Sequence, residues 1–245
     1  MSGIPIRFEQ DGYAVLQKIF SEEQLGPVSK EVDLVIEGRA TYVSASDLIN
    51  EPGSKPPRLR NAFRLHLYNE LFLRVPSEPA LVSAVESILG SPVRLYSSGL
   101  FAKPAEAGSE VPRHQDMPYW PFEPYEMLTA WIALDDSTVE NGCVRYASGS
   151  HKLGLLPHQP SGVSGNSLAL VPDNRVLSLP EHAVELRRGD CVLHHCLTVH
   201  RSEPNHSTAP RRGLTYVYMS PQERLTDASR LHGPALFPTI QAHAQ

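Results

Sequence analysis

Two segments in the first 90 residues have apolar positions at helical spacing. One reads SEEQLGPVSKEVDLVIEGR, where Ser21 is a candidate N-cap and Gln24 stands in position to complete a capping box. The other reads SEPALVSAVESILG, where Ser77 is the candidate cap and Gly90 marks the expected end. Because an apolar stripe on a helix usually faces a core, both segments are predicted to be packing helices.

The pattern changes after about residue 92, where short runs rich in β-branched and aromatic residues are bounded by Gly, Pro, Asn and Asp. These runs read SPVRLYSSGLFAK, EMLTAWIALDD, GCVRYAS, AVELRRGDCVLHH and GLTYVYMS. Such runs are typical of strands, and the Asn141-Gly142 pair between two of them predicts a hairpin turn. Several strands at this spacing favour an antiparallel sandwich or barrel.

A single domain over residues 1–245 is the expected organisation, since no internal repeat or low-complexity linker divides the chain. We expect packing helices in about residues 1–90 and a β core in about residues 92–220. Residues 40–62 and 153–180 are rich in Pro, Ser and Gly, so both are predicted to be long loops. Loops of this length usually serve as lids or binding loops, or are disordered. The C-terminal tail after the β core carries no recognisable signal.

Composition excludes several classes of partner. The formal net charge is −5 and no dense Lys/Arg run occurs, which argues against nucleic acid or an anionic membrane as the main partner. No run approaches the ~18 apolar residues of a membrane span, and the start of the chain lacks the apolar core of a signal peptide. Cys191 and Cys196 flank two histidines, but their spacing is not that of a zinc finger. With Cys143 they are predicted to be small core residues in a cytoplasmic protein.

His114 and Asp116 lie two residues apart in VPRHQDMPYW. Side chains at positions i and i+2 of an extended segment share a face, so this imidazole and carboxylate would project together while Gln115 points away. One histidine and one carboxylate are two thirds of the facial triad that holds non-haem Fe(II). The competing interpretation is a hydrogen bond in a surface turn, and with 11 histidines in the chain the motif alone is weak.

A second histidine would have to come from GDCVLHHCLTVHRSEPNHSTAPRRGLTYVYM, which contains His194, His195, His200 and His206. His200 is favoured because it lies where an expected strand gives way to a polar loop, and Arg211 follows 11 residues later. An Fe(II) oxygenase that uses 2-oxoglutarate needs a fixed cation for the far carboxylate, and a guanidinium binds a carboxylate bidentately. The other three histidines are interpreted as core, supporting or loop residues.

Several segments resemble, in order, the phytanoyl-CoA dioxygenase family of Fe(II)/2-oxoglutarate-dependent oxygenases. They are FEQDGYAVL, LFAKP followed by RHQD, AWIALDDSTVENGCVRYASGSHK, and GDCVLHHCLTVHRSEPNHSTAPRR. The resemblance covers roughly residues 8–220. It implies a mainly β fold with packing helices, a double-stranded β-helix of the jelly-roll or cupin-like kind. It also implies Fe(II), 2-oxoglutarate and O₂ as cofactor and cosubstrates, with His114, Asp116 and His200 as the iron ligands.

The same resemblance assigns residues to the cosubstrate pocket. Arg211 would bind the C5 carboxylate of 2-oxoglutarate, Ser202 would hydrogen-bond the same carboxylate, and Trp131 would line the pocket. Arg64, in AFRLHLY, falls where some family members have a basic residue near the cosubstrate. Arg212 is the alternative anchor, but adjacent strand residues face opposite ways, so only one of the two arginines can point inward.

The expected activity is oxidation of an unactivated C–H bond of a small molecule, by hydroxylation or by oxidative cyclisation or desaturation, in the tailoring of a natural product. An acyl-CoA hydroxylase is the alternative within the family. A cupin-like metalloenzyme or a ligand-binding barrel without 2-oxoglutarate are the alternatives outside it. Tyr119, Trp120 and Phe122, directly after Asp116, would either bind substrate or pack the segment onto the barrel. The sequence indicates no oligomeric state.

Overall fold

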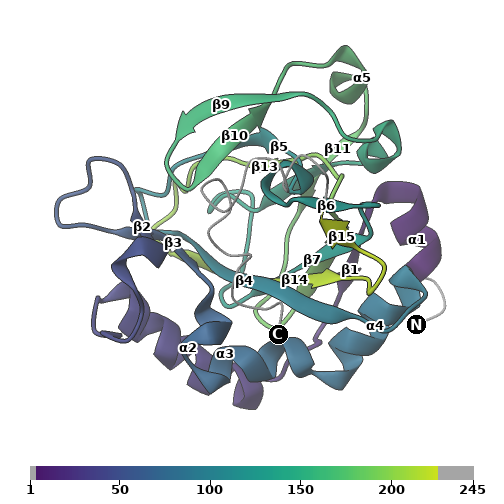
Figure 1. Ribbon diagram of the computed structural model, residues 1–245. Coiled ribbons are helices and arrows are strands. Elements are labelled where there is room, and N and C mark those ends of the chain that lie inside the picture. The colour runs from purple at the N-terminus through teal and green to yellow at the C-terminus, as the bar shows by residue number, and fades with distance from the viewer. Residues whose placement is uncertain (1–3, 226–245) are drawn as a thin grey trace.

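A seven-stranded antiparallel sheet forms the centre of the computed structural model, which describes residues 4–225 (Figure 1). From one edge of the sheet to the other, its strands are β1 (Tyr13–Leu16), β12 (Cys191–His195), β7 (Met127–Ala133), β14 (Arg211–Met219), β4 (Arg94–Lys103), β3 (Leu59–Phe63) and β2 (Leu48–Asn50). The strands β2, β3 and β4 follow one another in the chain, but β4, β14, β7 and β12 pair although segments of the second sheet lie between them in sequence.

A four-stranded antiparallel sheet forms the second layer. In order its strands are β11 (Glu181–Val184), β8 (Val144–Ala147), β13 (His200–Ser202) and β5 (Val111–His114). Two short ribbons complete the β structure: β9 (His158–Val163) with β10 (Asn166–Leu170), and β6 (Phe122–Glu123) with β15 (Arg224–Leu225). The prediction of a mainly β protein built as an antiparallel double-stranded β-helix is therefore confirmed.

Alternation along the central strands separates two environments. Every residue of β7 is buried, yet Leu128, Ala130 and Ile132 belong to the core beneath the helices, whereas Thr129 and Trp131 line a cavity between the sheets. This is the period-2 pattern of a strand covered on both faces. A strand that is apolar throughout thus still points alternate side chains at chemically different surroundings.

The larger helices cover the outer face of the seven-stranded sheet, as Figure 1 shows for α2, α3 and α4. The helices are α1 (Ile4–Asp11), α2 (Glu22–Ile36), α3 (Glu70–Arg74), α4 (Pro79–Leu89) and α5 (Asn174–Leu177). Both predicted packing helices are confirmed, as is the Ser21–Gln24 capping box. The prediction of Ser77 as a cap is wrong: Glu78 is the N-cap, and the Ser77 hydroxyl donates to the carbonyl of Leu73.

The N-terminal 90 residues contribute more than helices. Strands β1, β2 and β3 form both edges of the large sheet, so the expectation of an N-terminal part without strands is corrected. Residues 153–180, expected as a loop, contain β9, β10 and α5. Their Pro, Ser and Gly content concealed these short strands. Gly165 has the left-handed conformation that the hairpin turn needs, and Gly162 has one within β9, where the pairing register shifts.

The turn at Asn141-Gly142 does not join paired strands. Strand β7 pairs with β12 and β14, whereas β8 pairs with β11 and β13, so the chain crosses here from one sheet to the other. The predicted hairpin is therefore wrong, although the turn itself is present. Asn141 shapes the crossing by accepting the N–H of Thr138 with its side-chain oxygen.

All three cysteines are free thiols buried in the protein, as predicted. Among residues 4–225, none of the helices has the length and hydropathy needed to cross a membrane. Most of the C-terminal tail, from residue 226 onward, lies outside the described residues.

Candidate active site

A cavity of about 390 Å³ lies between the two sheets and collects most of the predicted site residues. Its lining includes the predicted residues His114, Asp116, Trp131, His200, Ser202 and Arg211. The same lining includes Thr129, His194 and Asn166, to which no specific site role was assigned from the sequence. The β-helix thus gathers into one space side chains that are up to about a hundred positions apart.

Strand pairing places two histidines opposite each other. His200 on β13 is the direct partner of His114 on β5. Each imidazole donates its Nδ1 proton to a carbonyl two residues earlier in the chain, over 2.8 Å to Pro112 and 3.0 Å to Thr198. A carbonyl can only accept, so both rings hold the tautomer whose Nε2 lone pair is free.

Asp116 completes the group from just beyond the end of β5. Its Oδ1 lies 3.6 Å from Nε2 of His114 and 3.6 Å from Nε2 of His200, and the three candidate ligand atoms lie within 4.8 Å of one another. Gln115 points away, as predicted: its amide binds the carbonyls of Gly154 and Leu197. Asp116 itself has helical backbone angles, so the shared face arises although only His114 belongs to the strand.

The second oxygen of Asp116 is held from behind. Thr129 donates to Oδ2 over 2.7 Å, and Nε2 of His194 lies 3.0 Å from the same oxygen. With its Nε2 proton given to Asp116, His194 presents Nδ1 as an acceptor, and the Tyr146 hydroxyl lies 3.2 Å from it. His194 is thus a supporting residue, which agrees with the sequence interpretation. Tyr146 was missed, because no local motif marks a tyrosine that acts through another side chain.

Burial sets the protonation of the three residues. Burial, with the neighbouring His114, lowers the pKa of His200 to about 3, and burial also lowers the pKa of His114. For Asp116, burial opposes ionisation, but His200 and the hydrogen bond from His194 outweigh it and hold its pKa well below the usual range. At neutral pH the site therefore presents two neutral imidazoles and one carboxylate.

Arg211 enters the same cavity from β14. Its side chain is buried, and its guanidinium carbon lies 5.1 Å from the centre of the Trp131 ring. Within the described part of the chain no carboxylate hydrogen-bonds the guanidinium, and its Nε has no partner. Burial lowers its pKa to about 10, so it remains a cation at neutral pH. An unpaired buried cation is costly unless a ligand supplies the anion.

Arg212 has the opposite surroundings. It binds Asp135 through Nε at 2.8 Å and also pairs with Asp33 of α2. The inward residue is therefore Arg211, the one that the sequence favoured. Trp131 fits beside it because Gly213 has no side chain: a Cβ there would collide with the indole. Ser202, two residues after His200, faces the same cavity and is buried.

Arg64 does not reach this cavity. Its guanidinium binds Asp47, with Nε 2.9 Å from the carboxylate, and its backbone is left-handed. The Asp47 carboxylate also accepts from Tyr68 over 2.6 Å, so this charge is already neutralised at the start of a short helical turn. The prediction that Arg64 approaches the cosubstrate is corrected by this placement.

The aromatic residues after Asp116 lie in two different places. Tyr119 and Trp120 line the cavity, whereas Phe122 packs in a separate cluster, with its ring centre 5.1 Å from that of Tyr96. Of the remaining histidines, His195 faces the outer side near Phe8, and His206 is exposed in a loop.

Comparison with known proteins agrees with this geometry. Residues 8–213 match the sequence model of the family described as Phytanoyl-CoA dioxygenase (PhyH). The chain belongs to the phytanoyl-CoA dioxygenase family. An ectoine dioxygenase from Bordetella bronchiseptica is a relative, 29% identical over 233 residues that cover 89% of this chain and 75% of the relative. The chain is accordingly an oxygenase of the iron- and 2-oxoglutarate-dependent kind that this family comprises.

Solved structures of this kind share the fold. The epimerase SnoN, in complex with Fe³⁺, α-ketoglutarate and nogalamycin RO, is 24% identical with a TM-score of 0.76, covering 92% of this chain and 85% of that one. EctD from S. alaskensis with 2-oxoglutarate and 5-hydroxyectoine is 24% identical with a TM-score of 0.79, covering 92% and 78%. The two structures hold different small molecules on the same fold.

The donor set of this chain fits iron. Two free Nε2 lone pairs and one carboxylate oxygen converge on one point, and each is oriented by a hydrogen bond on its far side. This is the ligand set of a facial triad with open positions, supported in the way that metal ligands usually are.

Proposed function

We propose that this protein binds Fe(II) through His114, Asp116 and His200 and 2-oxoglutarate through Arg211, and uses O₂ to oxidise an unactivated C–H bond of a small molecule. Ser202 would donate to the same carboxylate as Arg211, and Trp131 would form the apolar wall beside it. The observation that carries the proposal is that two complementary groups converge on one cavity. The His-Asp-His group has the donor set for a metal cation, and the buried Arg211 has no carboxylate partner among the described residues.

Iron and 2-oxoglutarate together supply the oxidant: one oxygen atom of O₂ enters succinate as CO₂ is released, and the other is available to the substrate. The protein's own groups position the reactants. Arg211 fixes the distal carboxylate by charge-assisted hydrogen bonds, which are shorter and stronger than neutral ones. Thr129 and His194 restrain Asp116, so that Oδ1 remains turned toward the two imidazoles.

We further propose that the reaction tailors a small natural product, by hydroxylation or by ring closure or desaturation. The cavity supports this: aromatic residues Phe63, Phe101 and Trp120 form its walls, and no lysine lines it within residues 4–225. An acyl-CoA substrate, as the family name suggests, is the alternative, and would have to keep its phosphates outside this space.

Anaerobic titration with Fe(II) and then 2-oxoglutarate tests the proposal. The weak visible charge-transfer band of the chelate should develop in the wild type and be lost in His114→Ala. Arg211→Ala should need far more 2-oxoglutarate to reach the same absorbance. Arg212→Ala is the matched control, since its guanidinium binds Asp135 and Asp33 on the other face of the strand, and should leave the titration unchanged.

The rival functions give different results. A cupin-like metalloenzyme would bind metal but show no band with 2-oxoglutarate, and would be indifferent to Arg211→Ala. A ligand-binding barrel would consume no O₂ and form no succinate under any condition. Either result in folded protein would contradict the proposal.

A further inference from the structure

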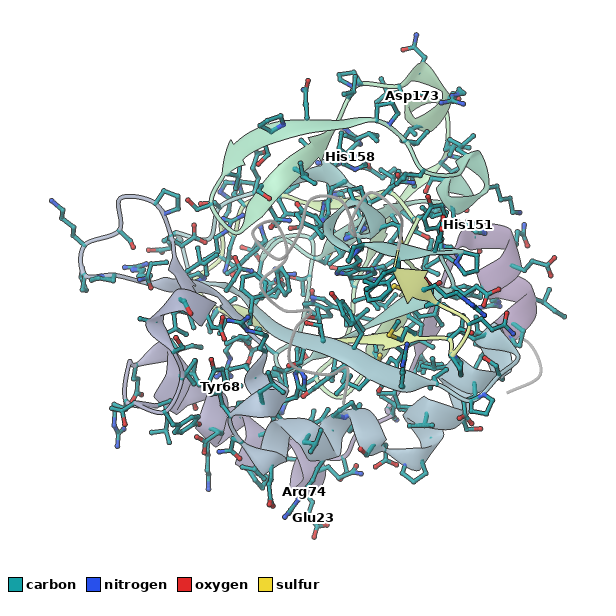
Figure 2. All side chains as sticks on the ribbon, in the orientation of Figure 1. Glu23, Tyr68, Arg74, His151, His158 and Asp173 are labelled. Carbon is teal, nitrogen blue, oxygen red and sulfur yellow. The ribbon has the colours of Figure 1, made fainter. Side chains whose placement is uncertain are left out.

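The β9–β10 hairpin covers the cavity and is fixed at both ends. At its base, Nε2 of His158, labelled in Figure 2, accepts the backbone N–H of Gln115 over 3.0 Å, directly between two of the proposed iron ligands. At its far end, the backbone of Gly165 lies so close to Asn61 on β3 that a Cβ would collide with the amide oxygen. The hairpin is therefore held in place against both sheets.

A third contact orients the strand between these ends. The Tyr119 hydroxyl receives the N–H of Leu168 over 3.0 Å and lies 3.3 Å from the carbonyl of the same residue. Because Tyr119 follows Asp116 by three residues, strand β10 is positioned by the same segment that carries the iron site. The residues of β10 that face the cavity consequently have defined positions relative to the triad.

Asn166 is the residue of this strand with an unmet hydrogen-bonding requirement. Its side chain is 4% exposed and lines the cavity, and its Oδ1 is buried with no partner among the described residues. Its Nδ2 lies 3.5 Å from Nε2 of His114, and the amide also interacts with the Tyr119 hydroxyl. The His114 lone pair is the one proposed to bind iron, so metal binding would remove that contact and leave Oδ1 still without a partner. A buried amide in that state is costly.

The charges around the cavity do not call for an ionic substrate. Arg201 lines it but is bound by Glu181, with Nε 3.0 Å and Nη2 2.7 Å from the carboxylate, and also by Glu203. The proposed Fe(II), Asp116, Arg211 and doubly negative 2-oxoglutarate sum to zero. Once these are in place, the cavity offers aromatic walls, hydroxyl groups such as those of Ser97 and Ser167, and the buried amide of Asn166, all of them neutral.

We infer that Asn166 is the substrate-positioning residue, and that it selects an uncharged group, a hydroxyl or an amide, close to the carbon that reacts. This deepens the proposed function and rests on it. The amide can donate and accept, so a neutral group that does both satisfies it. A carboxylate or phosphate would enter the cavity without a counter-ion, and a bare alkyl chain would leave the amide unpaired.

A comparison of melting temperatures tests whether the amide of Asn166 contributes to the stability of the fold. Asn166→Leu should leave the melting temperature of the protein loaded with Co(II) and 2-oxoglutarate nearly unchanged, because the buried Oδ1 has no hydrogen bond to lose. Asn205→Leu is the matched control: it is equally buried, but its amide donates to the carbonyls of Lys103 and Ala209, so the melting temperature should fall by several degrees. Asn166→Ala, which adds no volume, separates poor fit of leucine from a lost hydrogen bond.

If the melting temperature fell equally in the Asn166 and Asn205 variants, Asn166 would be shown to stabilise the fold, and the inference would be overturned. Failure of the wild type to bind Co(II) and 2-oxoglutarate would contradict the proposed function instead, so the two failures are distinguishable.

Substrate selection is tested by succinate release with matched probes: uncharged ring alcohols and amides, the corresponding carboxylates, and fatty acyl-CoA thioesters. We expect only uncharged compounds to accelerate turnover, and Asn166→Leu to raise their KM at least tenfold. Acceleration by carboxylates or thioesters, or an equal KM in Asn166→Leu, would overturn the inference. If no probe accelerates turnover, the stability comparison decides.

Discussion

Arg211 and Arg212 are neighbours on β14, yet one faces the cavity between the sheets and the other faces the helices. The outer arginine has two carboxylates, Asp135 and Asp33, within hydrogen-bonding distance. The inner arginine has an aromatic ring and an unpartnered Nε. On the outer face the fold supplies the counter-ion of each charge, whereas on the inner face it leaves the counter-ion to a ligand.

The histidines of β12 repeat this comparison. His194 faces inward and binds the carboxylate of Asp116, next to the proposed metal position. His195 faces outward, packs near Phe8 and His151, and accepts the N–H of Leu197 with Nδ1. We therefore expect these inner residues to contribute to ligand binding and the outer ones to stability, and substitutions at adjacent residues should separate the two effects.

The largest expected effect is that of Arg211→Leu. It should weaken 2-oxoglutarate binding by about 100- to 1000-fold, because a buried charge pair loses one partner. The free energy of unfolding of the ligand-free protein should hold or rise, since an unpaired buried cation is replaced by an apolar side chain. Calorimetric titration with 2-oxoglutarate and urea unfolding measure the two quantities.

Arg212→Leu should give the reverse pattern, with unchanged 2-oxoglutarate affinity and a lower free energy of unfolding, because Asp135 and Asp33 lose their shared cation. If both variants lost affinity alike, the distinction between the faces of β14 would fail.

The next effect concerns metal binding. His194→Phe removes the donor behind Asp116 and should weaken Fe(II) binding by about 10- to 100-fold, the usual cost of losing a residue that orients a metal ligand. Competition with a chromophoric chelator under anaerobic conditions measures it. His195→Phe is the adjacent control and should leave metal affinity unchanged; an equal loss there would indicate general disruption of β12.

The free energy of unfolding should change with pH by about 2 kcal/mol because of His195, on the outer face of the sheet. Burial, with the neighbouring His151 and His194, lowers the pKa of His195 to about 4. The unfolded chain binds this proton near pH 6.5, so between that pH and about 4 it binds more protons than the folded protein. The free energy of unfolding should therefore fall by about 2 kcal/mol from pH 7 to pH 5 through this residue.

The measurement is made on metal-free protein. Between pH 7 and pH 5, the free energy of unfolding should fall by about 2 kcal/mol less in His195→Gln than in the wild type. Parallel curves for the two proteins would show that His195 titrates normally in the folded state.

The smallest effect should come from Tyr146→Phe. It removes only the hydroxyl 3.2 Å from Nδ1 of His194, so the ring tautomer is less restrained while the bond to Asp116 stays. One neutral hydrogen bond is worth about 0.5–1.5 kcal/mol, which corresponds to a roughly two- to tenfold loss of metal affinity. A loss as large as that of His194→Phe would mean that Tyr146 acts directly on the site.

The parts of the site that the sequence predicted are those governed by strand periodicity. Arg211 and Arg212 face opposite ways because they are adjacent in a strand. His114 and Asp116 project together as expected, although Asp116 lies just beyond the strand with helical backbone angles. His200 was favoured from its place at a strand end, the family resemblance added Trp131, and the structure brings both into the same cavity. Their roles in catalysis stay predictions until metal and cosubstrate binding are measured.

The parts that were not predicted depend on which strand pairs with which. Asn141-Gly142 has the composition of a hairpin turn, but its flanking strands belong to different sheets. Arg64 was predicted to lie near the cosubstrate, but its guanidinium binds Asp47, 17 residues earlier in the chain. Asn166 carries no motif at all. The pairing of β10 with β9 and the contacts of the hairpin with Asn61, Gln115 and Tyr119 bring it close to His114.

The β9–β10 hairpin has a consequence for how such an enzyme could diversify. It is one short contiguous stretch, residues 158–170, and contributes none of the His-Asp-His group or Arg211. Changes in that stretch could therefore alter which molecule is accepted while leaving the oxidising machinery intact. Such changes would have to keep Gly165, since only glycine fits against Asn61. A descendant that kept this glycine and varied its neighbours would inherit the chemistry and acquire a new substrate.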